Sequence, residues 1–307
     1  MHGYIGLGHM GGAIARRLLE TGPLLVFDLK SAAVTDLCDA GATAAQSVAE
    51  IARQCQVIFL CLPTSAHVRE TLLGKDGIAG HATPGTLIVD QTSGDPAETQ
   101  TMAAELERHG LVLVDAPVSG GPRRAVAGTL AVMVGADPAA YARLHGILAP
   151  VTSNIFHAGP VGAGNVAKLA NNLLLAGQQV VTLEAVAFAA RNGVPPEAMC
   201  DILMAGTGNS YYLANLLSTH IVKGKLRYTG ALGTLQKDVS LACKLADSSG
   251  AALMLGGTVR ALLQQAVNEF GTEISVNALA LTMERLVGAQ IVPVPNDLDI
   301  EGGDGNG

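Results

Sequence analysis

The sequence is poor in aromatic residues and in charge. Aromatic residues make up 3% of the 307 residues and tryptophan is absent, whereas 37 residues are glycine. Only 15% of the residues are charged and 49% are hydrophobic, which excludes an intrinsically disordered chain. The formal net charge of -7 argues against a nucleic-acid-binding protein, because such a protein presents a basic face. The length is typical of about two domains.

Paired cysteines and long apolar runs are also missing. The chain contains five cysteines, Cys38, Cys55, Cys61, Cys200 and Cys243. Their odd number and the absence of a C-x-x-C pair predict neither a disulfide framework nor a metal site, and they favour a reducing compartment. No stretch reaches the ~18 uncharged apolar residues of a membrane span, and the first twelve residues do not resemble a signal peptide. We therefore expect a cytoplasmic protein without membrane or nucleic-acid partners.

Two patterns of hydrophobicity divide the chain near residue 160. Before that point, short apolar runs alternate with helical segments, and we expect strands at 4–7, 24–27, 57–62, 86–89, 112–114, 130–134 and 155–156. After Gly159 no strand is predicted, and we expect helices at about 165–192, 196–204, 210–222, 234–249, 252–270 and 275–288. Alternating strands and helices indicate a mostly parallel sheet with helices on both faces.

The predicted fold class is α/β with two domains and a tail. Residues 1–160 are expected to form a Rossmann-type, doubly wound, mostly parallel sheet that binds a dinucleotide. Residues 161–293 are expected to form an all-helical domain for substrate binding and dimerisation, joined to the first by a long interdomain helix. Residues 294–307 are glycine-rich and acidic, without a basic residue, and we expect them to be disordered.

A glycine-rich loop follows the first predicted strand. The segment Gly6, Leu7, Gly8, His9, Met10 and Gly11 matches G-x-G-x-x-G between a predicted strand and a predicted helix. In a dinucleotide-binding unit, Gly6 permits the tight turn, Gly8 lets the pyrophosphate approach the backbone, and Gly11 lets the helix pack on the strand. The alternative is a glycine-rich turn in an unrelated α/β protein.

Asp28 ends the second predicted strand, 22 positions after Gly6. An acidic residue at about this distance accepts hydrogen bonds from the adenosine ribose. Its charge would repel a 2′-phosphate, so NAD is favoured over NADP. The alternative role for Asp28 is that of a solvated turn residue.

Polar residues interrupt apolar structure in four further segments, at 90–96, 115–122, 159–172 and 236–242. In the second of these, Ser119-Gly120-Gly121 has a hydroxyl and open backbone N–H groups that suit a carboxylate. In the third, Lys168 and Asn172 are four positions apart and share one face of a helix. They either serve a site or form a solvated surface stripe, and their spacing does not decide between the two.

Taken together, these motifs resemble the β-hydroxyacid dehydrogenases, the family that contains 3-hydroxyisobutyrate dehydrogenase and tartronate semialdehyde reductase. The resemblance extends from Gly3 to about Val287 and rests on GLGHMG, DQTSGDP, DAPVSGG, the G-x-x-G-x-G-x-x-x-K-x-x-x-N run at 159–172, and KDVSLA. It implies an NAD(P)-dependent enzyme that is dimeric or tetrameric through its helical domain. The segment 206–212 departs from better-known members at the substrate end, so the substrate stays open.

The resemblance also implies roles for particular residues. The family's catalytic lysine falls on Lys168 and its substrate-positioning amide on Asn172. The predicted substrate-binding residues are Ser119, Gly120, Gly121, Thr92 (or Ser93) and Lys237, and Asp238 is a neighbour in the closing site. The predicted cofactor-binding residues are Gly6, Leu7, Gly8, His9, Met10, Gly11, Asp28, Leu62, Pro63, Thr64, Thr92 and Lys237.

The resulting hypothesis is the reversible oxidation of a small β-hydroxyacid to its semialdehyde or keto acid, with hydride transfer to NAD and Lys168 as general acid/base. An imine reductase shares this architecture but typically lacks the lysine. The 6-phosphogluconate dehydrogenases are longer chains, and no arginine-rich phosphate site is visible here. A non-catalytic NAD-binding redox sensor would keep Gly6, Gly8 and Asp28 but need not keep Lys168.

Overall fold

The computed structural model describes residues 1–294 and consists of two compact units. The first unit comprises Met1–Lys168 and the second begins at Leu169. Apart from Val294, the segment predicted to be disordered (294–307) lies outside the described residues.

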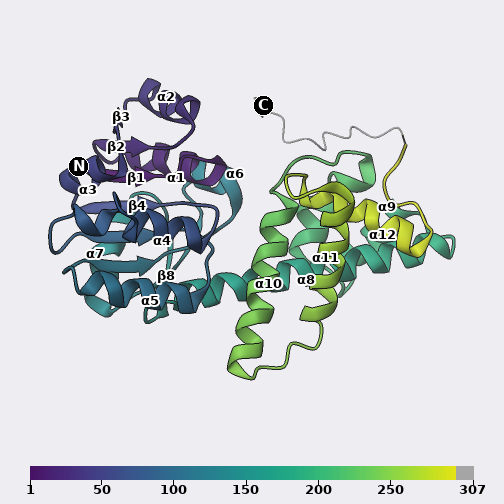
Figure 1. Ribbon diagram of the computed structural model, residues 1–307. Helices are drawn as coiled ribbons and strands as arrows, with labels where there is room; N and C mark the ends of the chain where they lie inside the picture. The colour runs from purple at the N-terminus through teal and green to yellow at the C-terminus, as the bar shows by residue number, and fades with distance from the viewer. Residues whose placement is uncertain (295–307) are drawn as a thin grey trace. The chain divides into compact units, whose positions relative to one another are not determined.

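A nine-stranded sheet forms the middle of the first unit (Figure 1). Its strand order is β3-β2-β1-β4-β5-β6-β8-β7, with β9 beside β8. The strands are β1 (His2–Ile5), β2 (Leu24–Phe27), β3 (Thr43–Ala44), β4 (Val57–Leu60), β5 (Leu87–Asp90), β6 (Val112–Asp115), β7 (Val118–Ser119), β8 (Ala131–Gly135) and β9 (Asn154–Gly159). All pairs from β3 to β6 are parallel, and β8 is antiparallel to β6 and β7. The order reverses between β1 and β4, where doubly wound sheets bind their ligands.

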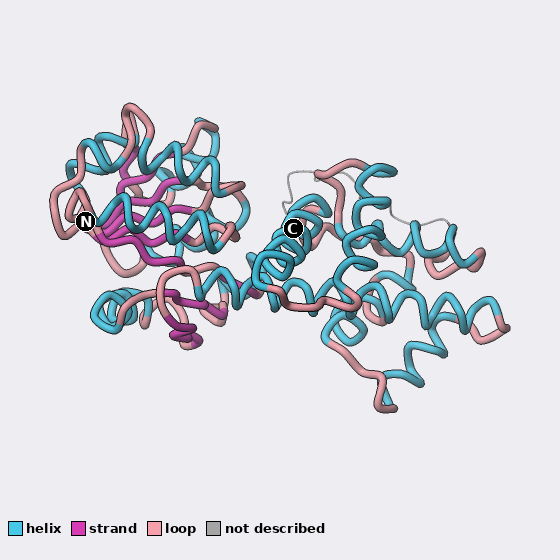
Figure 2. Tube along the Cα trace, turned by 60° about the horizontal axis from the view of Figure 1, so that its bottom comes forward, coloured by secondary structure: helices cyan, strands magenta, loops and turns pink. Residues whose placement is uncertain are grey.

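Helices cover both faces of this sheet (Figure 2). They are α1 (His9–Leu19), α2 (Ser31–Asp39), α3 (Val48–Gln54), α4 (Ser65–Leu73), η1 (Ile78–Gly80), α5 (Pro96–Glu107), α6 (Gly121–Val126) and α7 (Pro138–Leu148). Successive strand residues point to opposite faces, so Tyr4 and Phe59 pack under α1 and α7, whereas Ile5 and Ile58 pack under α3 to α5. Each fully buried apolar side chain contributes about 1.5–3 kcal/mol.

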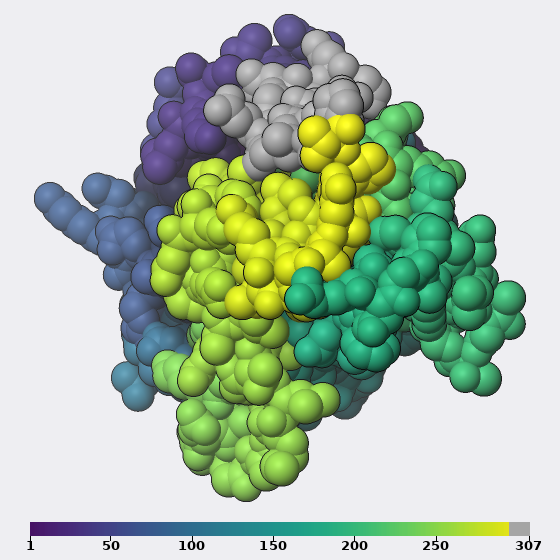
Figure 3. Space-filling view, turned by 90° about the vertical axis from the view of Figure 1, so that its right-hand side faces the viewer, coloured from purple at the N-terminus to yellow at the C-terminus, as the bar shows by residue number. Residues whose placement is uncertain are grey.

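The second unit is helical and is built around the long helix α8 (Ala163–Arg191), which starts in the first unit. The other helices are α9 (Pro196–Ala205), η2 (Leu213–Leu217), η3 (Ile221–Lys223), α10 (Leu232–Ser249), α11 (Gly256–Phe270), η4 (Val276–Ala278) and α12 (Leu279–Val287). The core contains Ala176, Leu183 and Val186 of α8, each with 0% exposure. Helices α10 and α11 pack against each other, and the yellow-green α11 and yellow α12 lie side by side in Figure 3.

Helix α8 is the one helix within residues 1–294 that is long and apolar enough to cross a membrane by length and composition. Much of its apolar window is buried inside the protein, where its side chains form the centre of the second unit. We therefore assign α8 as the core helix of the second unit.

The structure confirms the predicted fold class, but it adds two short strands that were not predicted, β3 and β7, and it shifts several element boundaries. The first strand ends at Ile5 rather than at residue 7, because Gly6 takes φ +92° and turns the chain into α1. Among the described residues, extended pairing after Gly159 consists of isolated bridges, one of which joins Ala231 and Ser275.

Two predicted helices of the second unit were wrong in extent. The segment 210–222 is not one α-helix, because Ser218 N donates to Leu213 O at 3.1 Å in an i to i+5 bond and the chain continues through a separate 3₁₀ turn, η3. The segment predicted at 252–270 becomes helical only at Gly256, where a Cβ would lie 3.0 Å from the Leu253 Cβ.

Candidate active site

The glycine-rich loop has the geometry of a phosphate cradle. A Cβ on Gly6 would lie 2.3 Å from the Cys61 carbonyl oxygen, and one on Gly11 would lie 2.0 Å from the Gly6 oxygen. These two glycines therefore let the backbone pack on itself. A Cβ on Gly8 would meet nothing within 4 Å, so this position faces open space. His9 and Met10 begin α1, whose N-cap Gly8 makes no side-chain hydrogen bond. The N-terminus of a helix suits an anion.

Asp28 fixes this loop from the neighbouring strand. Its Oδ2 accepts from Leu7 N at 2.6 Å, and its Oδ1 accepts from Lys30 N at 2.7 Å. The carboxylate keeps further lone pairs for hydroxyl donors. Because β1 and β2 are adjacent and parallel, the acid and the loop lie at the same edge of the sheet. The loop and Asp28 thus fit a dinucleotide.

The next two strands bring the other predicted cofactor residues to the same edge. Leu62 follows β4, and its N–H donates to the Thr92 hydroxyl at 3.0 Å after β5. Thr92 N donates in turn to Asp90 Oδ1 at 2.9 Å. Thr64 caps α4 by accepting from His67 N, which fixes the Leu62-Pro63-Thr64 turn. These contacts place the Leu62–Thr64 segment and Thr92 together.

A buried layer of polar side chains lies next to these loops. Tyr4 Oη donates to Gln91 Oε1 at 2.6 Å, and it is also hydrogen-bonded to the Cys61 thiol. Burial raises the pKa of Cys61 to about 12, and the charge of Asp90 adds to the effect. The thiol therefore stays protonated at neutral pH, and we assign Cys61 a packing role rather than a nucleophilic one.

The predicted carboxylate-binding segment forms a tight turn between β7 and α6. Gly120 and Gly121 have φ values of +131° and +71°, a region that L side chains rarely adopt. A Cβ on Gly121 would meet nothing within 4 Å, so the turn is open at this position. Together with the Ser119 hydroxyl, this turn suits an anionic oxygen.

Asp115, which the sequence did not mark as a site residue, holds the start of α8. Its side chain is fully buried, Oδ1 accepts from Gly162 N and Oδ2 accepts from Asn165 N, each at 2.7 Å. Burial raises the pKa of Asp115, and the backbone hydrogen bonds oppose that rise. Lys168 stands one helical turn beyond Asn165 and belongs to the first unit.

The second unit brings Asn172 and Lys237 together through another buried carboxylate. Asn172 Nδ2 donates to Asp238 Oδ2 at 2.6 Å, and Lys237 Nζ lies 3.0 Å from Asp238 Oδ1. Asp238 has 0% exposure and Asn172 has 7%. Asn171 Nδ2 donates to Asn172 Oδ1 at 3.0 Å and fixes the other end of that amide. The sequence predicted Asp238 only as a neighbour in the closing site and did not predict its hydrogen bond to Asn172. Its position next to Lys237 in the chain was the one indication of its role.

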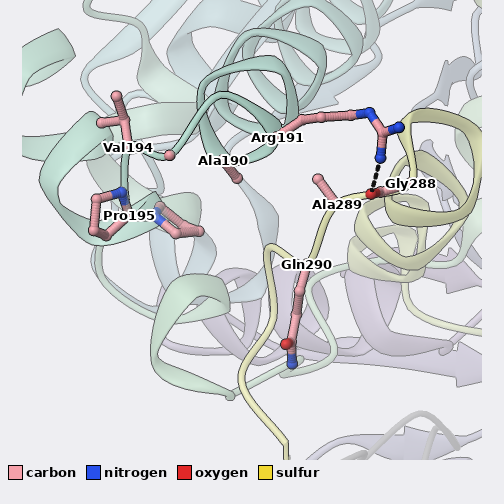
Figure 4. A pocket seen from close by; sticks show the side chains of 9 residues that line it. Ala190, Arg191, Val194, Pro195, Gly288, Ala289 and Gln290 are labelled. Carbon is pink, nitrogen blue, oxygen red and sulfur yellow. Dashed lines mark hydrogen bonds between the residues drawn. The ribbon is translucent and has the colours of Figure 1, made fainter.

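Within residues 1–294, neither a metal-binding cluster nor the pocket at the far end of α8 marks a second catalytic centre. Within residues 1–294, no group of three or more His, Cys, Asp or Glu side chains is arranged to hold a metal ion. A surface pocket lies at the far end of α8, where Arg191 Nη1 donates to Gly288 O at 2.8 Å (Figure 4). Lys168 and Arg191 are 23 positions apart on one helix, which corresponds to about 35 Å at 1.5 Å per residue. The pocket is therefore remote from Lys168.

Two family profiles match consecutive parts of the chain. The family profile described as the NAD binding domain of 6-phosphogluconate dehydrogenase matches residues 2–159. The profile described as NAD-binding of NADP-dependent 3-hydroxyisobutyrate dehydrogenase matches residues 162–282. The chain belongs to the β-hydroxyacid dehydrogenase family. It is accordingly an oxidoreductase with an NAD-binding domain, as its sequence predicted.

Three similar proteins illustrate the range of the family. The NAD-dependent L-serine dehydrogenase of Pseudomonas aeruginosa is 42% identical over 68% of this chain and 71% of its own length. The 2-(hydroxymethyl)glutarate dehydrogenase of Eubacterium barkeri is 36% identical over 78% of this chain and 80% of its own. The structure of Mycobacterium tuberculosis 3-hydroxyisobutyrate dehydrogenase with L-serine has a TM-score of 0.82 at 27% identity, covering 92% of this chain and 98% of its own.

The two loop glycines provide a paired test of the cradle. Gly8→Ala should leave the stability of the cofactor-free protein unchanged. If the pyrophosphate binds here as predicted, the added Cβ would occupy its space and weaken NADH binding at least ~10-fold, about 1.4 kcal/mol. Gly11→Ala should reduce both the stability of the protein and its affinity for NADH, because the added Cβ collides with the Gly6 carbonyl. Fluorescence titration and urea denaturation measure the two effects. Unchanged NADH binding by Gly8→Ala would contradict the assignment.

Proposed function

We propose that this family member is an NAD-dependent dehydrogenase of small 3-hydroxy acids that carry a substituent on C2. L-serine, 3-hydroxyisobutyrate and 2-(hydroxymethyl)glutarate, which appear in the names of its relatives, share a hydroxymethyl group on the carbon next to a carboxylate. The reaction converts that primary alcohol into an aldehyde, giving the corresponding semialdehyde.

The anchoring of α8 is the observation that carries the proposal. The first turn of this helix is hydrogen-bonded to Asp115, at the end of β6, and to Gly94, in the loop that follows β5. That loop also contains Thr92, which is tied to Leu62 beside the glycine-rich loop. The fixed first turn therefore supports Lys168 as the proton-transfer group of a dinucleotide site at this sheet edge.

Lys168 acts as the general acid/base in this mechanism. When the alcohol is oxidised, Nζ of the neutral amine accepts the hydroxyl proton while a hydride leaves the carbinol carbon; in the reverse direction the ammonium donates the proton to the forming hydroxyl. The nicotinamide, when bound, accepts or supplies the hydride. A neighbouring cationic group would favour the neutral amine.

The remaining site residues position the substrate. The Ser119 hydroxyl and the Gly120-Gly121 backbone hold the carboxylate, which decides which face of the carbinol carbon meets the cofactor. Asn172 orients the hydroxyl or the lysine, and the buried Asp238 carboxylate holds the Asn172 amide at 2.6 Å. Lys237 is paired with the same carboxylate, and its family motif assigns it to the nicotinamide and the substrate.

The proposed cofactor is NAD rather than NADP. Gly6 to Gly11 hold the pyrophosphate, and Leu62, Pro63, Thr64, Thr92 and Lys237 complete the cofactor-binding set. Asp28 receives the ribose hydroxyls, and its negative charge repels a 2′-phosphate. Leu29, which follows Asp28, is 92% exposed and provides no positive charge for that phosphate.

We also propose that the enzyme is a cytoplasmic homodimer or homotetramer assembled through the second unit. Leu174, Val181 and Phe188 of α8 are 58–67% exposed and recur every seven residues, so they form one apolar stripe along the helix. A second copy of the chain would cover this stripe. None of the five cysteines, all within the described residues, forms a disulfide, which agrees with a reducing compartment.

Lys168→Ala tests the proposed chemistry. We expect kcat with a 3-hydroxy acid to fall at least ~100-fold, because general acid–base catalysis is removed, while the dissociation constant for NADH changes little. Lys75→Ala, which removes an exposed lysine away from the site, is the control and should behave like the wild type. Added primary amine should restore part of the lost rate. Normal turnover by Lys168→Ala would end the proposal.

Asp28→Asn tests the choice of cofactor. Asparagine keeps an acceptor for the Leu7 N–H but removes the charge, so kcat/KM with NADP should rise at least ~10-fold relative to NAD, about 1.4 kcal/mol. Steady-state kinetics with both cofactors measure the ratio. Asp39→Asn, an exposed acid at the end of α2, should leave the ratio unchanged. An unchanged ratio in Asp28→Asn would contradict the role of its charge.

Val181→Glu tests the assembly. A carboxylate in the middle of the apolar stripe should dissociate the oligomer, because it would be buried without a partner. Sedimentation velocity at micromolar concentration should then show monomers. Val126→Glu changes a 71% exposed valine of the first unit and should preserve the oligomer. An unaltered sedimentation coefficient in Val181→Glu would place the interface elsewhere.

A further inference from the structure

The side chain of Asn165 is fully buried at the start of α8 and uses both ends of its amide. Its Oδ1 accepts from Gly94 N at 3.0 Å, and its Nδ2 donates to the Thr99 hydroxyl at 3.1 Å. Its backbone N–H donates to the Asp115 carboxylate at 2.7 Å. All four residues belong to the first unit. In the G-x-x-G-x-G-x-x-x-K-x-x-x-N motif at 159–172, the specified positions are the glycines, Lys168 and Asn172, and Asn165 occupies an unspecified position.

These hydrogen bonds connect two parts of the proposed site. Gly94 stands two positions after Thr92 in the loop that follows β5. Lys168 stands three positions after Asn165, which is slightly less than one helical turn. A single buried amide therefore fixes the separation between the loop of Thr92 and the helix of Lys168.

The backbone around Asn165 is packed closely enough to transmit a small displacement. A Cβ on Gly164 would lie 2.3 Å from the Met133 carbonyl oxygen, so the helix start touches the sheet directly. Gln100 Nε2 donates to Val161 O at 3.2 Å and adds a second link from α5. The start of α8 cannot shift without displacing its neighbours, because the groups in contact are closely packed backbone.

We propose that Asn165 is a positioning residue that holds the Lys168 amine at the reacting oxygen by tying α8 to the loop after β5. The inference rests on the proposed function of Lys168. Only a side chain with one acceptor and one donor at this length satisfies both Gly94 N and the Thr99 hydroxyl. Without it, the buried Gly94 N–H loses its acceptor and the loop and helix relax apart.

Asn165→Ala should separate positioning from binding. We expect kcat to fall ~10- to 100-fold, since a displacement of about 1 Å has an effect of that size on reactions between oriented groups. The NADH dissociation constant should change less than about threefold, because the glycine-rich loop is untouched. Turnover is measured per NADH-binding site, so that an unfolded fraction does not count as lost activity. Wild-type kcat would overturn the inference.

A milder pair of variants follows from α5. Thr99 and Thr101 each donate their hydroxyl to the carbonyl four residues earlier, but only Thr99 also accepts from Asn165. Thr99→Val should therefore lower kcat at unchanged NADH affinity, and Thr101→Val should not. These two valine variants test whether the Asn165 amide positions Lys168 even if Asn165→Ala does not fold. Equal kcat values in the two valine variants would contradict the inference.

A double-mutant cycle with Lys168→Ala distinguishes positioning from a general structural role. If Asn165 acts through Lys168, the kcat loss of Asn165→Ala, or of Thr99→Val, should vanish in the Lys168→Ala background. Additive losses would overturn the inference while leaving the role of Lys168 intact. Normal turnover in the single variant Lys168→Ala would instead refute the proposed function itself.

Discussion

The carboxylate of Asp115 holds the N-terminus of α8 against the ends of β6 and β8. A buried carboxylate is costly unless it is hydrogen-bonded, and the first N–H groups of the helix supply the required donors at 2.7 Å. The positive end of the helix dipole adds to this stabilisation. Lys168 comes one turn later in the same unit. The account of the reaction depends on this anchor, because a lysine on a free helix end would have no fixed position.

The second unit uses the same physical device. Asp238 is buried at the side of α10 and binds the Asn172 amide and the Lys237 ammonium. In each unit, therefore, a buried acid fixes groups to which the proposed mechanism assigns a role. The proposed cofactor-binding residues follow from the sheet, because the ends of parallel strands meet at one edge and Asp28, Leu62 and Thr92 each stand just beyond such an end.

The fold was predictable because its signals are local. The run Val57–Leu62 and the loop from Gly6 to Gly11 each carry their information within six residues, and the predicted α/β class with a helical second half is confirmed. Boundaries were less predictable: 210–222 divides into η2 and η3 because main-chain hydrogen bonding there shifts to an i to i+5 pattern. Site residues could be named singly from motifs. The hydrogen bonds between these residues could not be predicted from the sequence, because the partners lie far apart in the chain. Asn165 and Gly94 are 71 positions apart, and Asn172 and Asp238 are 66 apart.

The most direct measurement of the central claim is a crystal structure of the enzyme with NAD and a non-turning-over 3-hydroxy acid analogue. The account predicts the Lys168 Nζ at ~2.6–3.2 Å from the analogue's 3-hydroxyl oxygen, the spacing of a proton-transfer pair. The carboxylate should lie on the Ser119-Gly120-Gly121 turn. A ternary complex in which the lysine amine points into bulk water, with the hydroxyl bound by other groups, would contradict the account.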